Sequence, residues 1–386
     1  MKINFKTFFL LVTAALSGFI GWSGIPYLLP FGLVILPVWY NAKNRWIAFL
    51  SVFIYLTTAS RYIPVGSIEF SGSTSMDEYF LWLGAVLVPS SLYLLFYSKK
   101  KICRLLGLFL ALTFSALPPF GLTCWTHPLL SLGAWFPGGG WVAIFLLLFM
   151  VPFFCIYPQT LILPIVLGVL LNSPPKISQN WVAENTTFSG KPSVSYQAPT
   201  LDEITSGIVN QIAIIKQINF KKISSKNILL PESSGGIYGR TSTLTLWKNN
   251  IKGDNTVFLN TTIVDNQKKK NSVIVAISKG DSEIIYYQRQ PTPASMWNPL
   301  KKYSYKSDWF KNPVVEYNQE RIAFLICYEQ VMVWTALHSM LNRPDIICAI
   351  SNIWWVKNGN LPAIQKSIMY SWAKLFSLPL VVAQNT

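Results

Sequence analysis

The chain has 386 residues, of which 51% are hydrophobic and 12% are charged, and its formal net charge is +16. Soluble globular chains carry about 25% charged residues, so this composition excludes a disordered protein and argues against an ordinary soluble enzyme. The basic residues are dispersed, with short runs only at Lys99–Lys101 and Lys268–Lys270, which argues against direct binding of nucleic acid.

The charges divide the chain into two parts. Residues 1–172 hold three acidic and nine basic side chains, whereas residues 173–386 hold the other 13 acidic and 23 basic ones. We therefore expect a transmembrane helical domain at 1–172, a linker rich in Pro, Ser and Asn at 173–200, and a domain of water-soluble composition at 201–386.

Long apolar stretches in the first part predict about seven membrane spans. A spanning helix needs about 20 apolar residues, and the second and last stretches are short by that measure. The stretches lie at about 5–22, 24–40, 46–63, 79–97, 102–119, 141–157 and 159–171. If the last stretch does not span, the following domain would be cytoplasmic.

Basic residues predict the orientation of these spans. They precede the first span at Lys2 and Lys6, follow the second at Lys43 and Arg45, and follow the fourth at Lys99–Arg104. These are alternate loops, and the positive-inside rule makes their side cytoplasmic. Seven spans in a bacterial inner membrane then place residues 201–386 on the outer, periplasmic side.

The second part of the chain has the pattern of an α/β layered domain, because strand-like and helix-like segments alternate. Helices are expected at 201–223, 330–341 and 361–376. Strands are expected at 227–230, 256–264, 272–278, 283–288, 321–327, 345–351 and 378–384.

Two residues follow predicted strands in positions suited to catalysis. Cys327 ends an apolar strand before a predicted helix, whose dipole would lower the pKa of the thiol. Glu232 closes another apolar strand and could act as a general base. The alternatives are a small buried core residue for Cys327 and a solvated loop residue for Glu232.

The cysteines and histidines give no sign of a metal or cofactor site. The five cysteines include no CxxC pair, and the two histidines, His127 and His338, are far apart. Cys348 lies within an apolar strand and is interpreted as a core residue. We therefore expect neither a structural zinc ion nor a cofactor.

An ordered set of motifs is similar to a known family. Leu229-Leu230-Pro231-Glu232 is followed by Cys327-Tyr328-Glu329 and by Ser351-Asn352-Ile353-Trp354-Trp355, with further matching runs at 116–121, 127–128, 136–138, 290–297, 362–365 and 378–386. This set resembles the membrane-bound branch of the carbon–nitrogen hydrolase (nitrilase) superfamily. That branch comprises the apolipoprotein N-acyltransferases and the TraB-type conjugal transfer proteins, and the run at 290–297 favours the conjugal subgroup.

The resemblance implies a fold, a reaction and partners. It implies a nitrilase-like α-β-β-α sandwich after the multi-span helical domain, and a thioester-forming acyltransferase or amidase similar to apolipoprotein N-acyltransferase. Carried over to this chain, Cys327 is the nucleophile and Glu232 the general base, while Tyr328 and Glu329 orient the thioacyl intermediate. The implied partners are a membrane phospholipid as acyl donor and a lipoprotein or a protein of the conjugation machinery.

The family's catalytic lysine is replaced in this chain. The matching segment Tyr286–Pro291 puts Gln288 at the lysine position, with Arg289 next to it. Arg289 could stabilise an oxyanion but could not shuttle a proton, because its pKa stays above about 12; alternatively, it is a solvated strand residue. The family also continues past Asn-Thr with a further strand and a transmembrane helix, whereas this sequence ends at Thr386. The replaced lysine favours the alternative function, which is a non-catalytic membrane component of a conjugal transfer system.

Overall fold

The computed structural model describes residues 4–71, 76–170, 173–185, 201–220, 226–236, 241–266, 269–302, 304–353, 356 and 359–385. The chain forms two compact units. The first comprises Met1–Lys176, Val331–Leu337 and Trp355–Leu378, and the second comprises Ile177–Gln330, His338–Trp354 and Pro379–Thr386.

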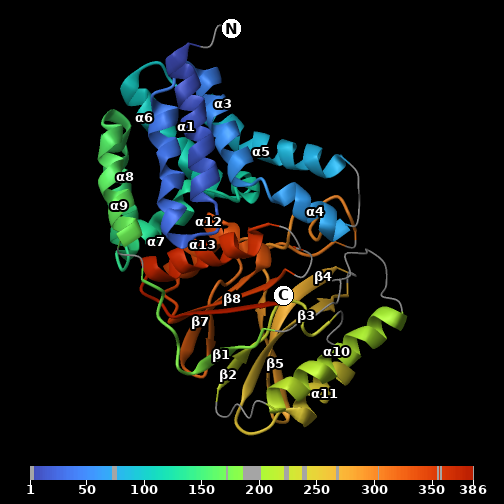
Figure 1. The fold of residues 1–386 in the computed structure, drawn as a ribbon. Coiled ribbons are helices and arrows are strands. Elements are labelled where there is room, and N and C mark those ends of the chain that lie inside the picture. The colour runs from blue at the N-terminus through green and yellow to red at the C-terminus, as the bar shows by residue number, and fades with distance from the viewer. Residues whose placement is uncertain are drawn as a thin grey trace. The chain divides into compact units, whose positions relative to one another are not determined.

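The first unit is helical (Figure 1). Its elements are α1 (Phe5–Gly21), η1 (Pro26–Val34), α2 (Ile35–Tyr40), α3 (Arg45–Ala59), α4 (Ile63–Ser71), α5 (Asp77–Leu95), α6 (Lys101–Ala116), η2 (Phe120–Thr123), η3 (Pro128–Ser131), α7 (Leu132–Trp135), α8 (Gly140–Ile156), η4 (Pro158–Leu161), α9 (Ile162–Leu170) and α13 (Leu361–Leu375). Each of the seven apolar stretches expected from the sequence contains helical structure.

The described helices support fewer clear membrane spans than the sequence predicts. Only α5 is long and apolar enough to cross a membrane as a single helix in the described part of the chain. Two bent pairs would raise the number to three if each is one span: α3 with Ile63–Glu69, bent by 43°, and Pro128–Trp135 with α8, bent by 114°. The apolar helical character is confirmed, and the seven spans stay a prediction.

Close helix packing in the first unit depends on glycine. A Cβ atom on Gly18 of α1 would overlap the Tyr55 carbonyl oxygen of α3. A Cβ on Gly133 of α7 would overlap the carbonyl oxygen of Ser371 in α13, and the Gly133 N–H donates to Ser371 Oγ at 3.0 Å. These contacts explain why α13, which is far along the chain, packs as part of this helical unit.

The second unit contains two β-sheets in its described residues. One sheet has the order β1 (Trp181–Ala183), β2 (Asn227–Leu229), β3 (Thr256–Val264), β4 (Lys270–Ser278), β5 (Asp281–Tyr287). The other has the order β6 (Val315–Tyr317), β7 (Glu320–Ile326), β8 (Ile346–Asn352), β9 (Leu380–Asn385). Strands β1–β3 are parallel and β3–β5 antiparallel, whereas β6 is antiparallel to β7 and β7–β9 are parallel.

The two sheets pack face to face. Phe258 of β3 and Phe324 of β7 meet between them, with ring centroids 6.0 Å apart, inside one cluster of buried apolar side chains. On the other face of the first sheet, α10 (Leu201–Phe220) and α11 (Thr241–Asn250) bury Ile214 and Trp247 against β2–β4. The helix, sheet and sheet layers of the expected sandwich are therefore present (Figure 1).

The remaining helices after β7 are divided between the units. A short 3₁₀ helix, η5 (Cys327–Val331), is followed by α12 (Val333–Leu341). The start of α12 and the whole of α13 belong to the first unit. The second unit therefore does not contain α13, which the sequence places in the α/β domain.

Strand β1 lies in the segment expected to be a linker. Its Trp181 donates from Nε1 to Glu320 Oε2 at 2.8 Å and packs on Phe258, with ring centroids 4.5 Å apart. Residues 181–183 of the expected linker thus form the first strand of this sheet, while 186–200 lie outside the described residues.

Candidate active site

Glu232 and Cys327 meet at the ends of strands from the two sheets. Glu232 follows β2, and Cys327 comes directly after β7. The Cys327 thiol donates a hydrogen bond to the Glu232 carboxylate. The backbone N–H of Asn352, the last residue of β8, also donates to Glu232 Oε2, at 3.1 Å. Two residues from separate sequence motifs therefore form one contact, as the sequence predicts.

The backbone turns sharply at both residues. Cys327 has φ of +48° and Ser233, next to Glu232, has φ of +64°. Residues other than glycine seldom adopt this conformation, and such strain is concentrated at functional sites. The turn after Glu232 is fixed by Asn260 of β3, whose Oδ1 accepts from the Ser233 N–H at 2.8 Å.

Burial controls the protonation of the Glu232–Cys327 pair. Glu232 is 5% exposed, and burial raises the pKa of its carboxyl group to about 7, although the hydrogen bonds from Cys327 and Asn352 act in the opposite direction. Burial and the Glu232 charge raise the pKa of the Cys327 thiol. Hydrogen bonds from the backbone N–H groups of Asn352 and Tyr328 lower it, but by less. The resting pair is therefore a neutral thiol beside a carboxyl group that can accept its proton near neutral pH.

The expectation that a helix dipole lowers the pKa of Cys327 is wrong. The thiol stands at the start of a five-residue 3₁₀ helix, and α12 begins only at Val333. Such a short element has few aligned peptide dipoles, so burial and the adjacent carboxylate determine the direction of the shift.

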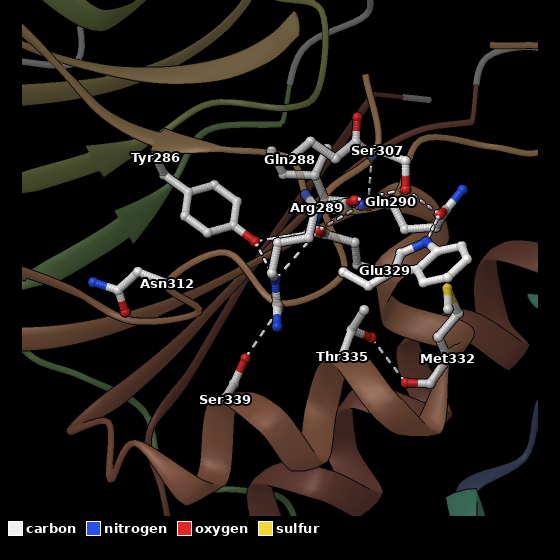
Figure 2. A network of polar contacts seen from close by, with 12 residues as sticks. Tyr286, Gln288, Arg289, Gln290, Ser307, Asn312, Glu329, Met332, Thr335 and Ser339 are labelled. Atoms are coloured by element: carbon white, nitrogen blue, oxygen red, sulfur yellow. Dashed lines mark hydrogen bonds and ion pairs between the residues drawn. The ribbon is translucent and has the colours of Figure 1, made fainter. Parts of the chain in front are cut away.

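Glu329 and Arg289 form a fully buried ion pair (Figure 2). Arg289 Nε lies 3.5 Å from Glu329 Oε1, and both side chains are 0% exposed. Tyr286 connects them, because its hydroxyl accepts from Arg289 Nε at 2.9 Å and donates to Glu329 at 3.2 Å. Arg289 Nη2 also donates to Ser339 Oγ at 3.1 Å. The alternative interpretation of Arg289 as a solvated residue is therefore wrong.

The Glu329 carboxylate also holds the backbone around Cys327. It accepts from the N–H of Ile326, the residue before Cys327, at 2.9 Å, and from the N–H of Arg289 at 2.6 Å. It thereby connects the end of β7 with the segment after β5. These hydrogen bonds hold the backbone next to Cys327 in place, which is a structural role. The oxyanion role of Arg289 and the intermediate-orienting roles of Glu329 and Tyr328 stay predictions.

Gln288, at the position of the family's lysine, lies beside the same strand end. Its Nε2 donates to the carbonyl oxygen of Ile326 at 3.1 Å, and its own N–H donates to Ser272 of β4 at 2.8 Å. The side chain is 5% exposed. Gln288 therefore lies next to the turn at Cys327.

Two asparagines that support the site were not singled out from the sequence. Asn385 of β9 accepts from the Ile353 N–H at 2.7 Å and donates to Asn352 Oδ1 at 2.5 Å, which fixes the turn whose N–H contacts Glu232. Asn260 donates to Ser272 Oγ and the Val273 carbonyl, both at 3.0 Å. A buried amide within an apolar strand is the sequence signal that could have identified Asn260.

No metal centre is indicated in the described part of the chain, where no group of three His, Cys, Asp or Glu side chains could hold an ion.

The chain is similar over nearly its whole length to two curated proteins. It is 32% identical to the probable conjugal transfer protein TraB of Sinorhizobium fredii, over 98% of this chain and 97% of that protein. It is 30% identical to the conjugal transfer protein TraB of Agrobacterium fabrum, over 98% of this chain and 92% of that protein. No protein-family model matches the chain.

Solved structures similar to part of the chain include nitrilase-superfamily members. A mutant of Nesterenkonia AN1 amidase has 11% identity and a TM-score of 0.39. Saccharomyces cerevisiae Nit3 has 13% identity and a TM-score of 0.40. Each match covers 55% of this chain and 79% of the other.

Proposed function

We propose that this chain, which belongs to the family of TraB conjugal transfer proteins, is a membrane-bound acyltransferase or amidase that works through a thioester on Cys327. The observation that carries the proposal is the hydrogen bond from the Cys327 thiol to the buried Glu232 carboxylate. A nucleophile in contact with a general base, at a strained turn on a strand end, is the arrangement that acyl transfer requires.

The proposed reaction has two half-reactions. Cys327 Sγ attacks the acyl carbon while its proton passes to Glu232, and Glu232 returns that proton to the leaving group as the thioester forms. Water or an amine then attacks the thioester, again with Glu232 as the proton acceptor, and the sulfur regains its proton as the acyl group leaves. The backbone N–H groups of Tyr328 and Asn352, which contact the sulfur, are suited to stabilise the charge on the acyl oxygen.

The proposal predicts an acid limb in the pH dependence of thioester formation. Only ionised Glu232 accepts the thiol proton, and burial raises the pKa of this carboxyl group to about 7. The acylation rate of Cys327 by p-nitrophenyl butyrate should therefore fall about tenfold for each pH unit below 7 and level off above it. Stopped-flow release of p-nitrophenol from the detergent-solubilised protein measures this rate.

Glu232→Gln removes the titrating group and should flatten the acid limb. An acylation rate of the wild-type protein that does not change between pH 5 and 7 would show that Glu232 is not the general base.

We also propose that the helical unit is embedded in the bacterial inner membrane, with about seven spans. In support, helices of this unit carry large apolar side chains on their outer surface. Examples are Phe5 and Phe9 of α1, 84% and 63% exposed, and Phe149 of α8, 81% exposed. Lipid is the environment in which such a surface is stable. A membrane phospholipid is the proposed acyl donor, and a lipoprotein or a protein of the conjugation machinery is the proposed acceptor.

The charge pattern of the loops predicts that the α/β part lies on the periplasmic side. Alkaline phosphatase fused after Pro192 should therefore be active, since the enzyme matures only outside the cytoplasm. The same reporter fused after Lys100, in a loop expected to be cytoplasmic, should be inactive. A cytoplasmic reporter such as green fluorescent protein should give the opposite pattern. The reverse result at both positions would invert the topology.

A non-catalytic role in conjugal transfer is the second candidate. It is favoured by Gln288 in the place of the family's lysine and by the ion pair that engages Arg289 with Glu329. Conjugation frequency with a Cys327→Ala chain distinguishes the two functions. An enzyme loses its contribution to transfer, whereas an assembly component retains it.

A further inference from the structure

Two loops of the first unit are joined in one surface. One loop connects α2 with α3, and the other connects α5 with α6. The hydroxyl of Tyr97 donates to the Ala42 carbonyl oxygen at 2.8 Å. Arg104 donates from Nη1 to the Tyr40 carbonyl oxygen and from Nε to the Ser98 carbonyl oxygen, both at 2.7 Å. These hydrogen bonds hold the two loops side by side.

Exposed cations lie on both loops, and we call them the basic patch: Lys43, Arg45, Lys99, Lys100 and Lys101. Among the residues that the structure describes, no carboxylate forms an ion pair with any of them. The acidic residues of 1–172 are Glu69, Asp77 and Glu78. Asp77 and Glu78 begin α5, whose 19 residues separate them from the patch by about 27 Å. Like charges gathered without a counter-charge repel one another, so an anion from outside the chain would stabilise the patch.

The basic patch lies where lipid headgroups are expected. It follows the end of α5, the helix that is long and apolar enough to cross a membrane. Trp46 and Ile102, next to patch residues in the sequence, are 62% and 76% exposed. Tryptophan is enriched at the level of the headgroups, and about four to eight Lys or Arg residues just cytoplasmic of a spanning helix are typical of binding to anionic lipids. The positive-inside rule needs cations in these loops, but it does not need the loops to be joined in one surface.

We propose that the basic patch binds the headgroups of anionic phospholipids in the cytoplasmic leaflet of the membrane. This inference rests on the proposed embedding of the helical unit in the inner membrane, and it does not require the thioester on Cys327. An anionic headgroup such as that of phosphatidylglycerol compensates the charge of the patch, whereas the zwitterionic headgroup of phosphatidylcholine does not. The acyl chains of the same lipid would cover the exposed side chains of Trp46 and Ile102, which a soluble anion would leave in water.

Displacement of a labelled lipid tests the assignment. Full-length protein in dodecyl maltoside micelles binds dansyl-phosphatidylglycerol, which is detected by energy transfer from the tryptophans and displaced with unlabelled phosphatidylglycerol or phosphatidylcholine. The readout is the ratio of the two displacement affinities, because non-specific partition into the micelle cancels. One variant changes each loop: Lys99→Gln/Lys100→Gln/Lys101→Gln and Lys43→Gln/Arg45→Gln. The matched control removes three exposed lysines of the second unit: Lys226→Gln/Lys252→Gln/Lys279→Gln.

The wild-type protein and the control should prefer phosphatidylglycerol by about tenfold or more, and each patch variant should lose most of this preference. If one patch variant does not fold, the other decides the test. A wild-type protein without the preference, or a preference that survives in the folded patch variants, overturns the role of the patch and leaves the membrane embedding intact. A single-stranded oligonucleotide that displaces the label more tightly than phosphatidylglycerol also overturns it, in favour of nucleic acid. A protein that binds neither lipid overturns the embedding, and the role of the patch with it.

Discussion

Replacing Glu329 with glutamine is expected to lower the free energy of unfolding by about 3–5 kcal/mol, because it leaves a buried charge without its partner. Both members of the Arg289–Glu329 pair are fully buried. Glutamine keeps the size of Glu329, but its NH₂ group would face a backbone donor, either the Ile326 N–H or the Arg289 N–H. Unfolding of the detergent-solubilised protein in guanidinium, followed by tryptophan fluorescence, measures the change.

The matched control is Glu316→Gln on the exposed side of β6, which should change stability by no more than about 0.5 kcal/mol. Arg289→Met added to Glu329→Gln should recover part of the loss, since it removes the unpaired charge. A Glu329→Gln protein as stable as the wild type would show that the Arg289–Glu329 pair is not ionised, or that the Arg289 charge does not stay buried in the variant.

Replacing Glu232 with glutamine is expected to reduce the rate of Cys327 acylation by about 10²–10⁴-fold, the usual contribution of a general base. The amide cannot take the thiol proton, and burial already keeps the pKa of that thiol high. The free energy of unfolding of the Glu232→Gln protein should not be lower than that of the wild type, although its activity is. Burial raises the pKa of Glu232, so ionising it reduces stability as the pH rises toward 7, and the neutral variant avoids this cost at pH 8.

Glu283→Gln, on the exposed face of β5, is the control and should acylate at the wild-type rate. If Glu232→Gln were acylated as fast as this control, the contact between Glu232 and Cys327 would be structural and not catalytic.

The sequence predicts much of the second unit because its strands are apolar and bounded by polar turns. Strands β3, β7 and β8 lie within a residue of their predicted bounds. Strand β1 was not predicted, because its three residues lie in a polar segment and gain their position from pairing with β2. The assignment of α13 to the helical unit was not predicted either, because it depends on the close approach of Ser371 to Gly133.

The sequence likewise predicts one part of the candidate site and not the other. Cys327 and Glu232 could be predicted because both follow apolar strands and fit the family motifs. The partner of Glu329 could not, because Arg289 is 40 positions away and only the packed sheets bring the two together. The hydrogen bond from the Asn352 N–H to Glu232 could not be predicted either, because the donor is a backbone group that nearly every residue carries. The sign of the Cys327 pKa shift depends on burial and on Glu232, neither of which a local pattern shows.

The most direct test of the account is to map butyryl groups on the full-length detergent-solubilised protein by mass spectrometry after reaction with p-nitrophenyl butyrate. We predict one butyryl group on the peptide that contains Cys327, labile to hydroxylamine as a thioester is. It should be absent from Cys327→Ala and retained in Cys103→Ala, which removes an exposed thiol. A butyryl group that persists in Cys327→Ala, or that resides on Cys103 instead, would contradict the proposal that Cys327 is the nucleophile.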